Sequence, residues 1–384
     1  MSHILGIESS CDETAAAVVD ASLHVRSNVV ASQYDLHAEY GGVVPEIASR
    51  AHLERVLPVI RKAIEEAGIG MHEVTAVAAG VRPGLIGSLL VGTSAAKGFA
   101  WARMLPFYAV DHVAAHMFAG LLRTDAAVPA ACGNAASGVA SGYPALGLVV
   151  SGGHTSLFRI ENPVACALLG RTIDDAVGEA MDKAASMLGL GHPGGPNLER
   201  CAQGGDAGAL RFATPQLPNM LDFSLSGLKT KLLYEVRGVP QGRGAQATFA
   251  RTSADLSESR RSDLAASFQK AAIAQVLDRL SRALDAAPAD GAARPQSLFV
   301  GGGVVSNASL RAALAAWCAS HEIALVVPER RFCVDNAAMI AGHAQLRRAL
   351  GDAGDDLSVP AEPVSLLARG AAPSRRGDGP KRVQ

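Results

Sequence analysis

The feature that most constrains the fold of this 384-residue chain is a pattern of apolar runs that occurs twice. Residues 3–8 (HILGIE) and 14–20 (TAAAVVD) are apolar runs separated by the polar turn S-S-C-D-E. Further along, residues 145–150 (ALGLVV) and the run T-S-L-F-R-I are separated in the same way by S-G-G-H. Because short apolar runs bounded by polar turns are typical of paired strands, the sequence predicts two copies of one strand-turn-strand unit.

The segments after each unit predict how it continues. In the first copy we expect a strand at 25–32, a helix at 46–67, a strand at 74–79, a helix at 88–103 and a strand at 107–110. In the second copy we expect helices at 174–189 and 263–287, a strand at 297–300, a helix at 308–319, a strand at 323–327 and a final helix from 336. The order β-β-β-α-β-α-β is that of a ribonuclease-H-like unit. We therefore expect the α/β fold of the two-lobed actin-like and Hsp70-like ATPases, with two such units around a central cleft.

The repeat also suggests a domain division. We assign a first lobe to residues 1–115, completed by the C-terminal helix at about 336–350, and a second lobe with the cleft site to residues 116–335. Two insertions without apolar periodicity, 124–142 and 239–262, are expected to be loops or disorder. The low-complexity tail 369–384 is expected to be disordered.

Composition restricts the classes of function. Lysine plus arginine (35) nearly balances aspartate plus glutamate (36), so RNA would have to meet a local basic patch. The six cysteines are far apart and form no C-x-x-C pair, which favours reduced thiols in a cytosolic protein. The N-terminus lacks a signal-peptide pattern, and no apolar stretch approaches the roughly 20 residues of a membrane span. We therefore expect a cytoplasmic protein that makes no use of a membrane.

Three glycine-rich turns are candidates for a nucleotide site. They are S-G-G-H-T (151–155), P-G-G-P (193–196) and G-G-G-V-V-S-N (301–307). Glycine turns let backbone N–H groups approach a phosphate, although a tight hairpin explains any single glycine pair equally well. Three such turns beside strands or helices of the second repeat favour a nucleotide in the cleft.

An acidic stretch, D-D-A-V-G-E-A-M-D-K (174–183), follows the first of these turns. On one helix, Asp175, Glu179 and Asp182 would lie on nearby faces, and Asp182 could hold ribose hydroxyls. For Asp174 and Asp175 we prefer a structural role, in which they complement the dipole at the start of the helix.

The pair H-V-A-A-H (112–116) places two imidazoles on one helix face, where they could bind one ion. Ordinary surface or core histidines explain such a pair about as well. A third ligand could be Asp335, at the start of the last predicted helix, although Asp335 could equally be an N-cap. Two histidines and one carboxylate with open positions are typical of iron(II) sites.

A series of motifs extends from Gly6 to about Ala341. In chain order they are I-E-S-S-C-D-E-T, H-A-E-Y-G-G-V-V-P-E-I-A-S-R, P-G-L-I-G-S-L-L-V-G, V-S-G-G-H-T, G-H-P-G-G-P, F-S-L-S-G-L-K-T, G-G-V-V-S-N and C-V-D-N-A-A-M-I-A. Together they resemble the tRNA threonylcarbamoyladenosine transferase family, called TsaD in bacteria and formerly labelled O-sialoglycoprotein endopeptidase.

The resemblance implies transfer of a threonylcarbamoyl group from threonylcarbamoyl-AMP to the exocyclic amine of the adenosine 3′ of the anticodon, in tRNAs that read codons beginning with adenine. It implies a metal site at His112, His116 and Asp335, usually taken as iron(II), with zinc also possible. The implied adenylate-binding residues are Val149, Val150, Ser151, Gly152, Gly153, Asp182, Gly195 and Asn307. The implied partners are a TsaB-like dimerising protein and a TsaE-like ATPase.

The activated donor needs a Lewis acid and a fixed orientation for the amine, and it does not need the glutamate of a protease. Asp12 or Glu13 is our candidate for a base that assists the amine. A metalloprotease is disfavoured, because the H-E-x-x-H glutamate is missing. An actin-like kinase or a nucleotide-binding regulatory module shares the fold and the turns, but it would not require the histidine pair.

Overall fold

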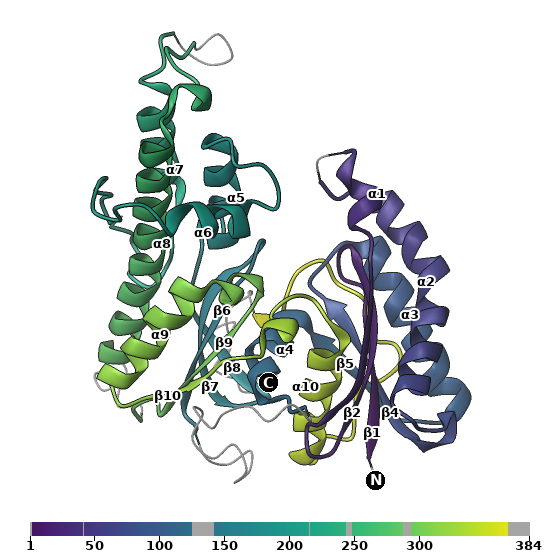
Figure 1. The fold of residues 1–384 in the computed structure, drawn as a ribbon. Helices are drawn as coiled ribbons and strands as arrows, with labels where there is room; N and C mark the ends of the chain where they lie inside the picture. The colour runs from purple at the N-terminus through teal and green to yellow at the C-terminus, as the bar shows by residue number, and fades with distance from the viewer. Residues whose placement is uncertain are drawn as a thin grey trace, which may run out of the picture.

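The protein is described by a computed structural model that covers residues 2–40, 42–124, 142–214, 216–242, 248–286 and 293–367. Its strands form two five-stranded sheets (Figure 1). The order of the first sheet is β3 (Val25–Ser32), β2 (Glu13–Asp20), β1 (His3–Glu8), β4 (Val74–Arg82) and β5 (Phe107–Asp111). The order of the second is β8 (Ala165–Arg171), β7 (Thr155–Asn162), β6 (Ala145–Val150), β9 (Ser297–Gly301) and β10 (Ala324–Val326).

The two sheets have the same strand directions. In each, the first three strands along the chain pair antiparallel, the fourth pairs parallel with the first, and the fifth pairs parallel with the fourth. The predicted α/β fold, with a duplicated β-β-β-α-β-α-β unit, is therefore confirmed by the sheet topology.

Helices lie outside the two sheets and between them (Figure 1). The outer face of the first sheet carries α2 (Pro45–Glu66) and α3 (Ile86–Arg103). The short helix α1 (Tyr34–Ala38) comes before α2 in the chain. Between the sheets lie α4 (His112–Phe118) and α10 (Ala337–Ala349). The far side of the second sheet carries α5 (Val177–Met187), α6 (Gly194–Ala202), α7 (Ser226–Arg237), α8 (Glu258–Ala286) and α9 (Ala308–Ser320). Short 3-10 turns are η1 (Met71–Glu73), η2 (Ala119–Leu121), η5 (Ser253–Asp255), η6 (Gly303–Ser306) and η7 (Arg330–Phe332).

Alternation along the strands explains this layering, because successive side chains of a strand point to opposite faces. In β6, Leu148 and Val150 join the core under α5–α9, whereas Val149 packs against α4. In β1, Leu5 and Ile7 face α2 and α3, whereas Ile4 faces α10. Both central strands are buried on both faces, so α4 and α10 are fixed between two cores.

Several sequence predictions need correction. The helix expected at 174–189 begins only at Val177, and the helix expected at 263–287 begins earlier, at Glu258. Residues 258–262 of the expected loop 239–262 are therefore helical. Their sequence E-S-R-R-S has no apolar residue, so the exposed first turn leaves no periodic signal. Elements β8, α6 and α7 were not predicted.

Other predicted segments lie largely or wholly outside the described residues, namely the insertion 124–142 apart from its two ends and the tail 369–384. Residues 351–367 pack along the first sheet, where Asp355 N donates to Phe107 O (2.7 Å) and Glu362 N donates to Val81 O (2.9 Å). Among the helices described, none combines the length and the apolar character needed to cross a membrane.

Candidate functional site

Helix α4 carries the histidine pair directly after β5. Asp111 ends the strand and caps the helix, since its Oδ1 accepts from Val113 N (3.0 Å) and Ala114 N (3.4 Å). The four-residue spacing places His112 and His116 on one face, with ring centroids 4.6 Å apart. The two residues are only 7% and 2% exposed. The pair is therefore a buried, helix-mounted unit between the two sheets.

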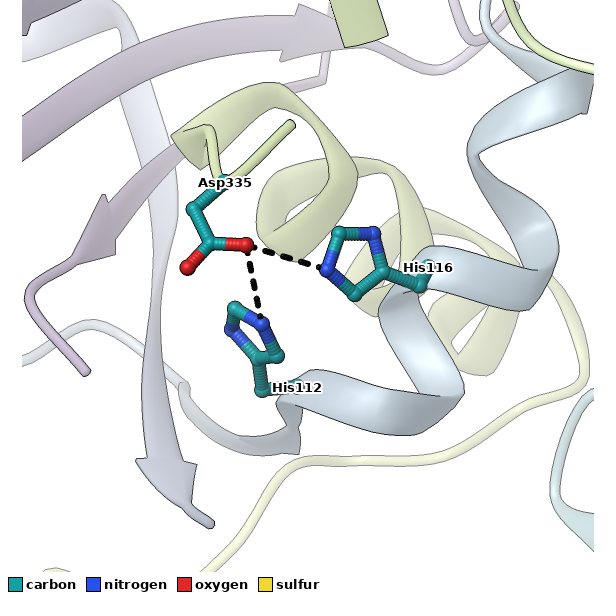
Figure 2. Close-up of side chains that lie close together, drawn as sticks. All are labelled: His112, His116 and Asp335. Carbon is teal, nitrogen blue, oxygen red and sulfur yellow. Dashed lines mark hydrogen bonds and ion pairs between the residues drawn. The ribbon is translucent and has the colours of Figure 1, made fainter. Parts of the chain in front are cut away.

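Asp335 meets both histidines from the opposite side (Figure 2). Its Oδ1 lies 3.3 Å from His112 Nε2 and 3.1 Å from His116 Nε2. The alternative role of Asp335 as an N-cap is wrong, because the side chain of Asn336 caps α10 by accepting from Met339 N (3.0 Å). Asn336 thus releases the carboxylate of Asp335 to face the histidines.

These three residues form what we call the histidine cluster: His112, His116 and Asp335. One ligand atom of each lies within 4.8 Å of the other two. Two imidazole nitrogens and one carboxylate oxygen converge from two chain segments, and this donor set suits a divalent transition metal, with iron(II) the typical occupant. The cluster therefore fits the metal that the sequence motifs imply, and it leaves open which metal is bound.

The charges of the cluster are strongly coupled. Burial opposes the charged form of His112, but the carboxylates of Asp335 and Glu8 outweigh it and raise the pKa of His112 well above its usual value. Burial likewise disfavours the charged form of Asp335, yet the adjacent His112 holds the pKa of Asp335 well below its usual range. Burial lowers the pKa of His116. Without an ion, the cluster favours a charged His112 beside a carboxylate.

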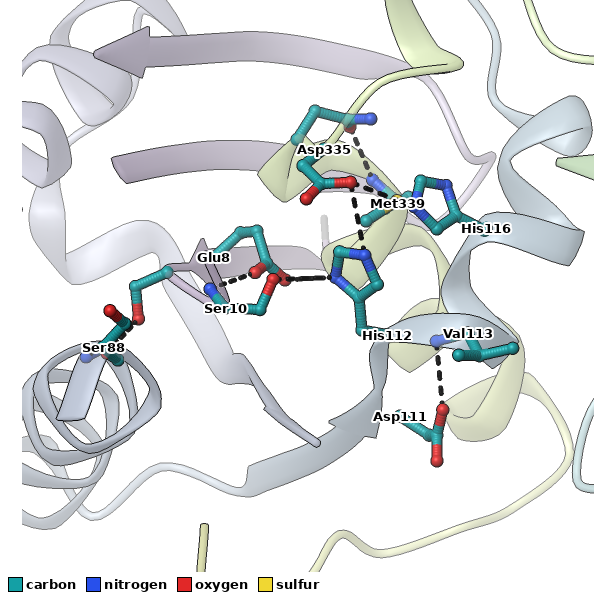
Figure 3. A network of polar contacts seen from close by, with 12 residues as sticks. Glu8, Ser10, Ser88, Asp111, His112, Val113, His116, Asp335 and Met339 are labelled. Carbon is teal, nitrogen blue, oxygen red and sulfur yellow. Dashed lines mark hydrogen bonds and ion pairs between the residues drawn. The ribbon is translucent and has the colours of Figure 1, made fainter. Parts of the chain in front are cut away.

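A second carboxylate, which the sequence analysis missed, lies behind His112 (Figure 3). Glu8 Oε2 is 3.1 Å from His112 Nδ1, and Ser10 Oγ is 3.3 Å from the same nitrogen. By contrast, His116 Nδ1 has no hydrogen-bond partner among the residues that the structure describes. The available signal was a single acidic residue at the end of the otherwise apolar strand HILGIE.

The three glycine turns surround one cavity of about 280 Å³, which we call the glycine-turn cavity. Four of the expected adenylate-binding residues line it: Gly152, Asp182, Gly195 and Asn307. Asp182 Oδ1 accepts from Gly195 N (2.8 Å), which ties α5 to the P-G-G-P turn. Asn307 caps α9 through Leu310 N (2.9 Å) and donates to Gln269 Oε1 (2.9 Å).

The other expected adenylate-binding residues lie at the end of β6. The side chains of Val149 and Val150 are fully buried in the core. Ser151 Oγ accepts from the backbone N–H of His154 (3.0 Å) and so shapes the turn. Gly153 has open space at its Cα and is not among the residues that line the cavity.

The G-G-G turn connects the cavity to the histidine cluster. A Cβ placed on Gly301 would lie 2.0 Å from the carbonyl oxygen of His116, so the turn touches α4. Gly303 lines the cavity, and a Cβ there would be 4.0 Å from a methyl carbon of Val334, the neighbour of Asp335. The two sites are therefore adjacent.

The predicted acidic helix is only partly right. Asp175 precedes α5 and pairs with Lys183 and Lys229. Asp174 accepts from Leu225 N (2.8 Å), so its carboxylate serves the start of α7 and not the start of α5. The link from β8 to α5 runs past α7, a tertiary contact that periodicity does not reveal.

Asp12 lies in the turn after β1, and Glu13 is the first residue of β2. The backbone oxygen of Asp12 accepts from Gln33 N (3.1 Å), and Glu13 Oε1 accepts from Ser32 Oγ (2.9 Å). Burial raises the pKa of Glu13, with a further contribution from the negative charges of Asp12 and Asp335.

Comparisons with known proteins identify the family. A family model described as "TsaD: tRNA N6-adenosine threonylcarbamoyltransferase" matches residues 24–342. A protein of that name from Sorangium cellulosum is 43% identical over 98% of this chain and 99% of its own length. Another from Trichlorobacter lovleyi is 44% identical over 95% of this chain and 98% of its own.

Solved structures overlap less closely. Component A of the (R)-2-hydroxyglutaryl-CoA dehydratase of Acidaminococcus fermentans is 11% identical, with a TM-score of 0.46 over 91% of this chain and 100% of its own. YeaZ from Pseudomonas aeruginosa is 18% identical, with a TM-score of 0.28 over 44% of this chain and 64% of its own. The assignment therefore rests on the sequence relatives and the family model: this chain belongs to the tRNA N6-adenosine threonylcarbamoyltransferase family and is a transferase.

Proposed function

We propose that the protein transfers the threonylcarbamoyl group from threonylcarbamoyl-AMP to the exocyclic amine of the adenosine 3′ of the anticodon, in tRNAs that read codons beginning with adenine. The observation that carries the proposal is the position of the histidine cluster directly beside the glycine-turn cavity, with Gly301 and Gly303 between them. The cavity would hold the adenylate while the reacting carbonyl lies toward His112 and His116.

In this proposal His112, His116 and Asp335 hold one divalent ion, which we take to be iron(II), with zinc as the alternative. A bound ion would supply Lewis acidity toward the carbonyl or phosphate oxygen of the donor. The burial of both imidazoles and the cap that Asp111 gives to α4 fix the direction in which the histidine nitrogens point. That rigidity supports a role in orienting the donor.

The cavity residues have separate tasks in the proposal. Of the turn 151–153, Gly152 lines the cavity, and its backbone N–H would face the phosphate, since glycine leaves space for close approach. The N–H of Ser151 already donates to His154 O (2.7 Å) and so holds the turn in shape. Asp182 would accept a hydrogen bond from a ribose hydroxyl with the lone pairs that Gly195 N leaves open. Asn307 would set the cavity wall, because its side chain is already engaged with α9 and Gln269.

For the base that accepts a proton from the amine, we propose Glu13, with Asp12 as the alternative. The raised pKa of Glu13 brings it nearer to neutral pH, where a general base is most effective. Its Oε2 is buried and has no hydrogen-bond partner among the described residues. No described protein group therefore competes with the substrate for a hydrogen bond to that oxygen.

We further propose that the protein works in the cytoplasm with tRNA, a TsaB-like dimerising partner and a TsaE-like ATPase. The side chains of Leu53 and Leu57 on α2 and Leu90 on α3 are 65%, 60% and 51% exposed. Exposed leucines on packed neighbouring helices support a docking surface for a protein partner.

The test is mass spectrometry of nucleosides from tRNA incubated with the protein, both partners and threonylcarbamoyl-AMP. We expect threonylcarbamoyladenosine with the unaltered protein and its loss with His112→Ala or His116→Ala. His72→Ala, an exposed histidine in η1, is the control and should leave the yield unchanged. A tRNA with guanosine in place of the target adenosine should give no product. If His112→Ala and His116→Ala kept full activity, the metal proposal would fail. Absence of product from a folded protein that binds the adenylate would favour a nucleotide-binding regulatory module.

A further inference from the structure

The motif P-G-L-I-G-S that follows β4 is not explained by the metal or the adenylate. Its last residue, Ser88, lies on the side of Ser10 that is away from His112 (Figure 3), and the motif contacts the turn that leaves β1. Leu85 N donates to Ser10 O (2.8 Å), and Gly92 N donates to Ser9 Oγ (3.1 Å). Ser9 Oγ in turn donates to Ser88 O (2.8 Å). Residues 8–10 are therefore held by the segment 80–92.

Three glycines make this contact possible. A Cβ at each glycine would lie within 2.4 Å of an atom of residues 8–10. The pairs are Gly80 with Glu8 Oε2 (2.4 Å), Gly84 with Ser10 O (2.4 Å) and Gly92 with Ser9 Oγ (2.3 Å). Contacts this short exclude any side chain at these positions without a shift of the neighbour. Each of the three consecutive residues 8, 9 and 10 thus faces its own glycine.

Glu8 is the residue of this turn that reaches the histidine cluster. It is 1% exposed, and its Oε1 accepts from Ser10 N (2.6 Å) while its Oε2 lies 3.1 Å from His112 Nδ1. A buried carboxylate is costly unless it is hydrogen-bonded and paired, and both conditions are met here. His112 therefore has one nitrogen directed at Glu8 and the other at Asp335.

We propose that Glu8 is a positioning residue for metal binding and that Gly80 is the gap that admits its carboxylate. Glu8 accepts the Nδ1–H of His112, which fixes the ring orientation and leaves the lone pair of Nε2 toward the ion. Metal-bound histidines usually donate their second N–H to such an acceptor, and loss of the acceptor weakens binding by about 10- to 100-fold. The inference rests on the proposed metal role of the histidine cluster.

The test measures the affinity of the metal-stripped full chain for Co²⁺, by competition with a chromogenic chelator, together with the visible spectrum of the bound Co²⁺. Glu8→Gln, which keeps the side-chain shape, should weaken binding by about 10-fold or more. Gly80→Ala should also weaken it, because the added methyl group displaces the Glu8 carboxylate. Gly98→Ala is the matched control, since a Cβ at Gly98 meets no atom within 4 Å.

The double variant Glu8→Ser with Gly80→Ala separates an effect of Glu8 on metal binding from an effect of Glu8 on folding alone. Removing the long side chain of Glu8 relieves its clash with the methyl group added at position 80. Without metal, the double variant should therefore melt at the same temperature as the unaltered protein, and it should still bind Co²⁺ weakly. Because both changes act on one carboxylate, their effects on affinity should be less than additive. Full affinity in the double variant would contradict the inference.

His116→Ala separates the positioning role of Glu8 from the metal role of the histidine cluster. If His116→Ala loses Co²⁺ binding while Glu8→Gln keeps the affinity and spectrum of the unaltered protein, the positioning role of Glu8 is wrong and the metal site stands. If His116→Ala binds as tightly as the unaltered protein, the metal proposal fails and the role of Glu8 fails with it. Weak binding in both variants, with an unchanged Gly98→Ala, is the expected result.

Discussion

Gly301 approaches the backbone of His116 so closely that a Cβ on the glycine would lie 2.0 Å from the histidine carbonyl oxygen. The end of β9 in the second sheet therefore touches α4, the helix that carries both histidines, through a position that only glycine fits. This contact links the cavity formed by the glycine turns to the histidine cluster on α4.

Gly301→Ala should disturb both sites, because a backbone oxygen cannot yield as the end of a side chain can. We expect a loss of about 1–3 kcal/mol in the free energy of unfolding and weaker Co²⁺ binding. Gly303→Ala in the same turn has open space at its Cα and should leave stability nearly unchanged. Chemical denaturation of both variants gives the comparison, and equal stabilities would contradict the close contact.

Asp182→Ala should weaken the binding of AMP, since Asp182 lines the glycine-turn cavity and holds the backbone of Gly195. Loss of one charge-assisted hydrogen bond predicts roughly a 10-fold rise in Kd. The control is Glu179→Ala on the same helix, whose side chain pairs with Lys183 and does not line the cavity. Calorimetric titration with AMP measures both, and an unchanged Kd for Asp182→Ala would remove that residue from the site.

Ser365→Ala should loosen α4, because Ser365 Oγ donates to Asp111 Oδ2 (2.6 Å) and Asp111 caps the helix that carries both histidines. A hydrogen bond to a carboxylate of this kind is worth about 2 kcal/mol. The control is Ser358→Ala, at an exposed position of the same segment. Thermal unfolding compares the two, and equal melting temperatures would show that residues 351–367 do not support α4.

The tail beyond this segment should be dispensable. Deletion of residues 370–384 is expected to leave the yield of modified tRNA unchanged, because no motif of the tail belongs to the site. A fall in yield, measured on nucleosides from the same tRNA, would assign the basic tail a role in binding RNA.

Acidification from pH 7 to pH 5 should destabilise the fold through His343. Burial lowers the pKa of His343 to about 4, and its Nε2 donates to Pro163 O (2.9 Å). An unfolded histidine titrates near 6.5, so the unfolded chain binds more protons than the folded one in this range. The free energy of unfolding therefore decreases by about 2 kcal/mol as the pH is lowered from 7 to 5. His343→Gln should flatten this part of the pH profile, whereas His72→Gln should not. An unchanged profile for His343→Gln would show that its folded pKa is not depressed.

The fold was predictable from the sequence where apolar runs are regular. In both copies the strand-turn-strand runs and the later strands lie close to their predicted places, because buried central strands leave long apolar runs. Strand β8 was missed, since it has mostly exposed and half-buried residues at the edge of the sheet. Helices α6 and α7 do bury residues four apart, as Leu228, Leu232 and Val236 show in α7. They were missed because each has glycine, which is typical of turns, within its first two residues.

The site was predictable only where motifs mark it. The spacing of His112 and His116 predicted a shared face, but nothing local could show that Asn336 takes the cap and frees Asp335. Glu8 was missed because its role arises from a contact between residues 104 positions apart in the chain. The need for glycine at position 80 was likewise not predictable, because it depends on the carboxylate of Glu8, which packs against Gly80 in the folded chain.

The role of the histidine cluster in transfer is tested by titrating metal-stripped protein with iron(II) under anaerobic conditions and measuring transfer to tRNA at each step. We expect threonylcarbamoyladenosine formation to rise with bound metal, to reach a plateau at one ion per chain and to stay at background in Asp335→Ala. Full transfer by the stripped protein, or a plateau that Asp335→Ala also reaches, would contradict the assignment of the reaction to the histidine cluster.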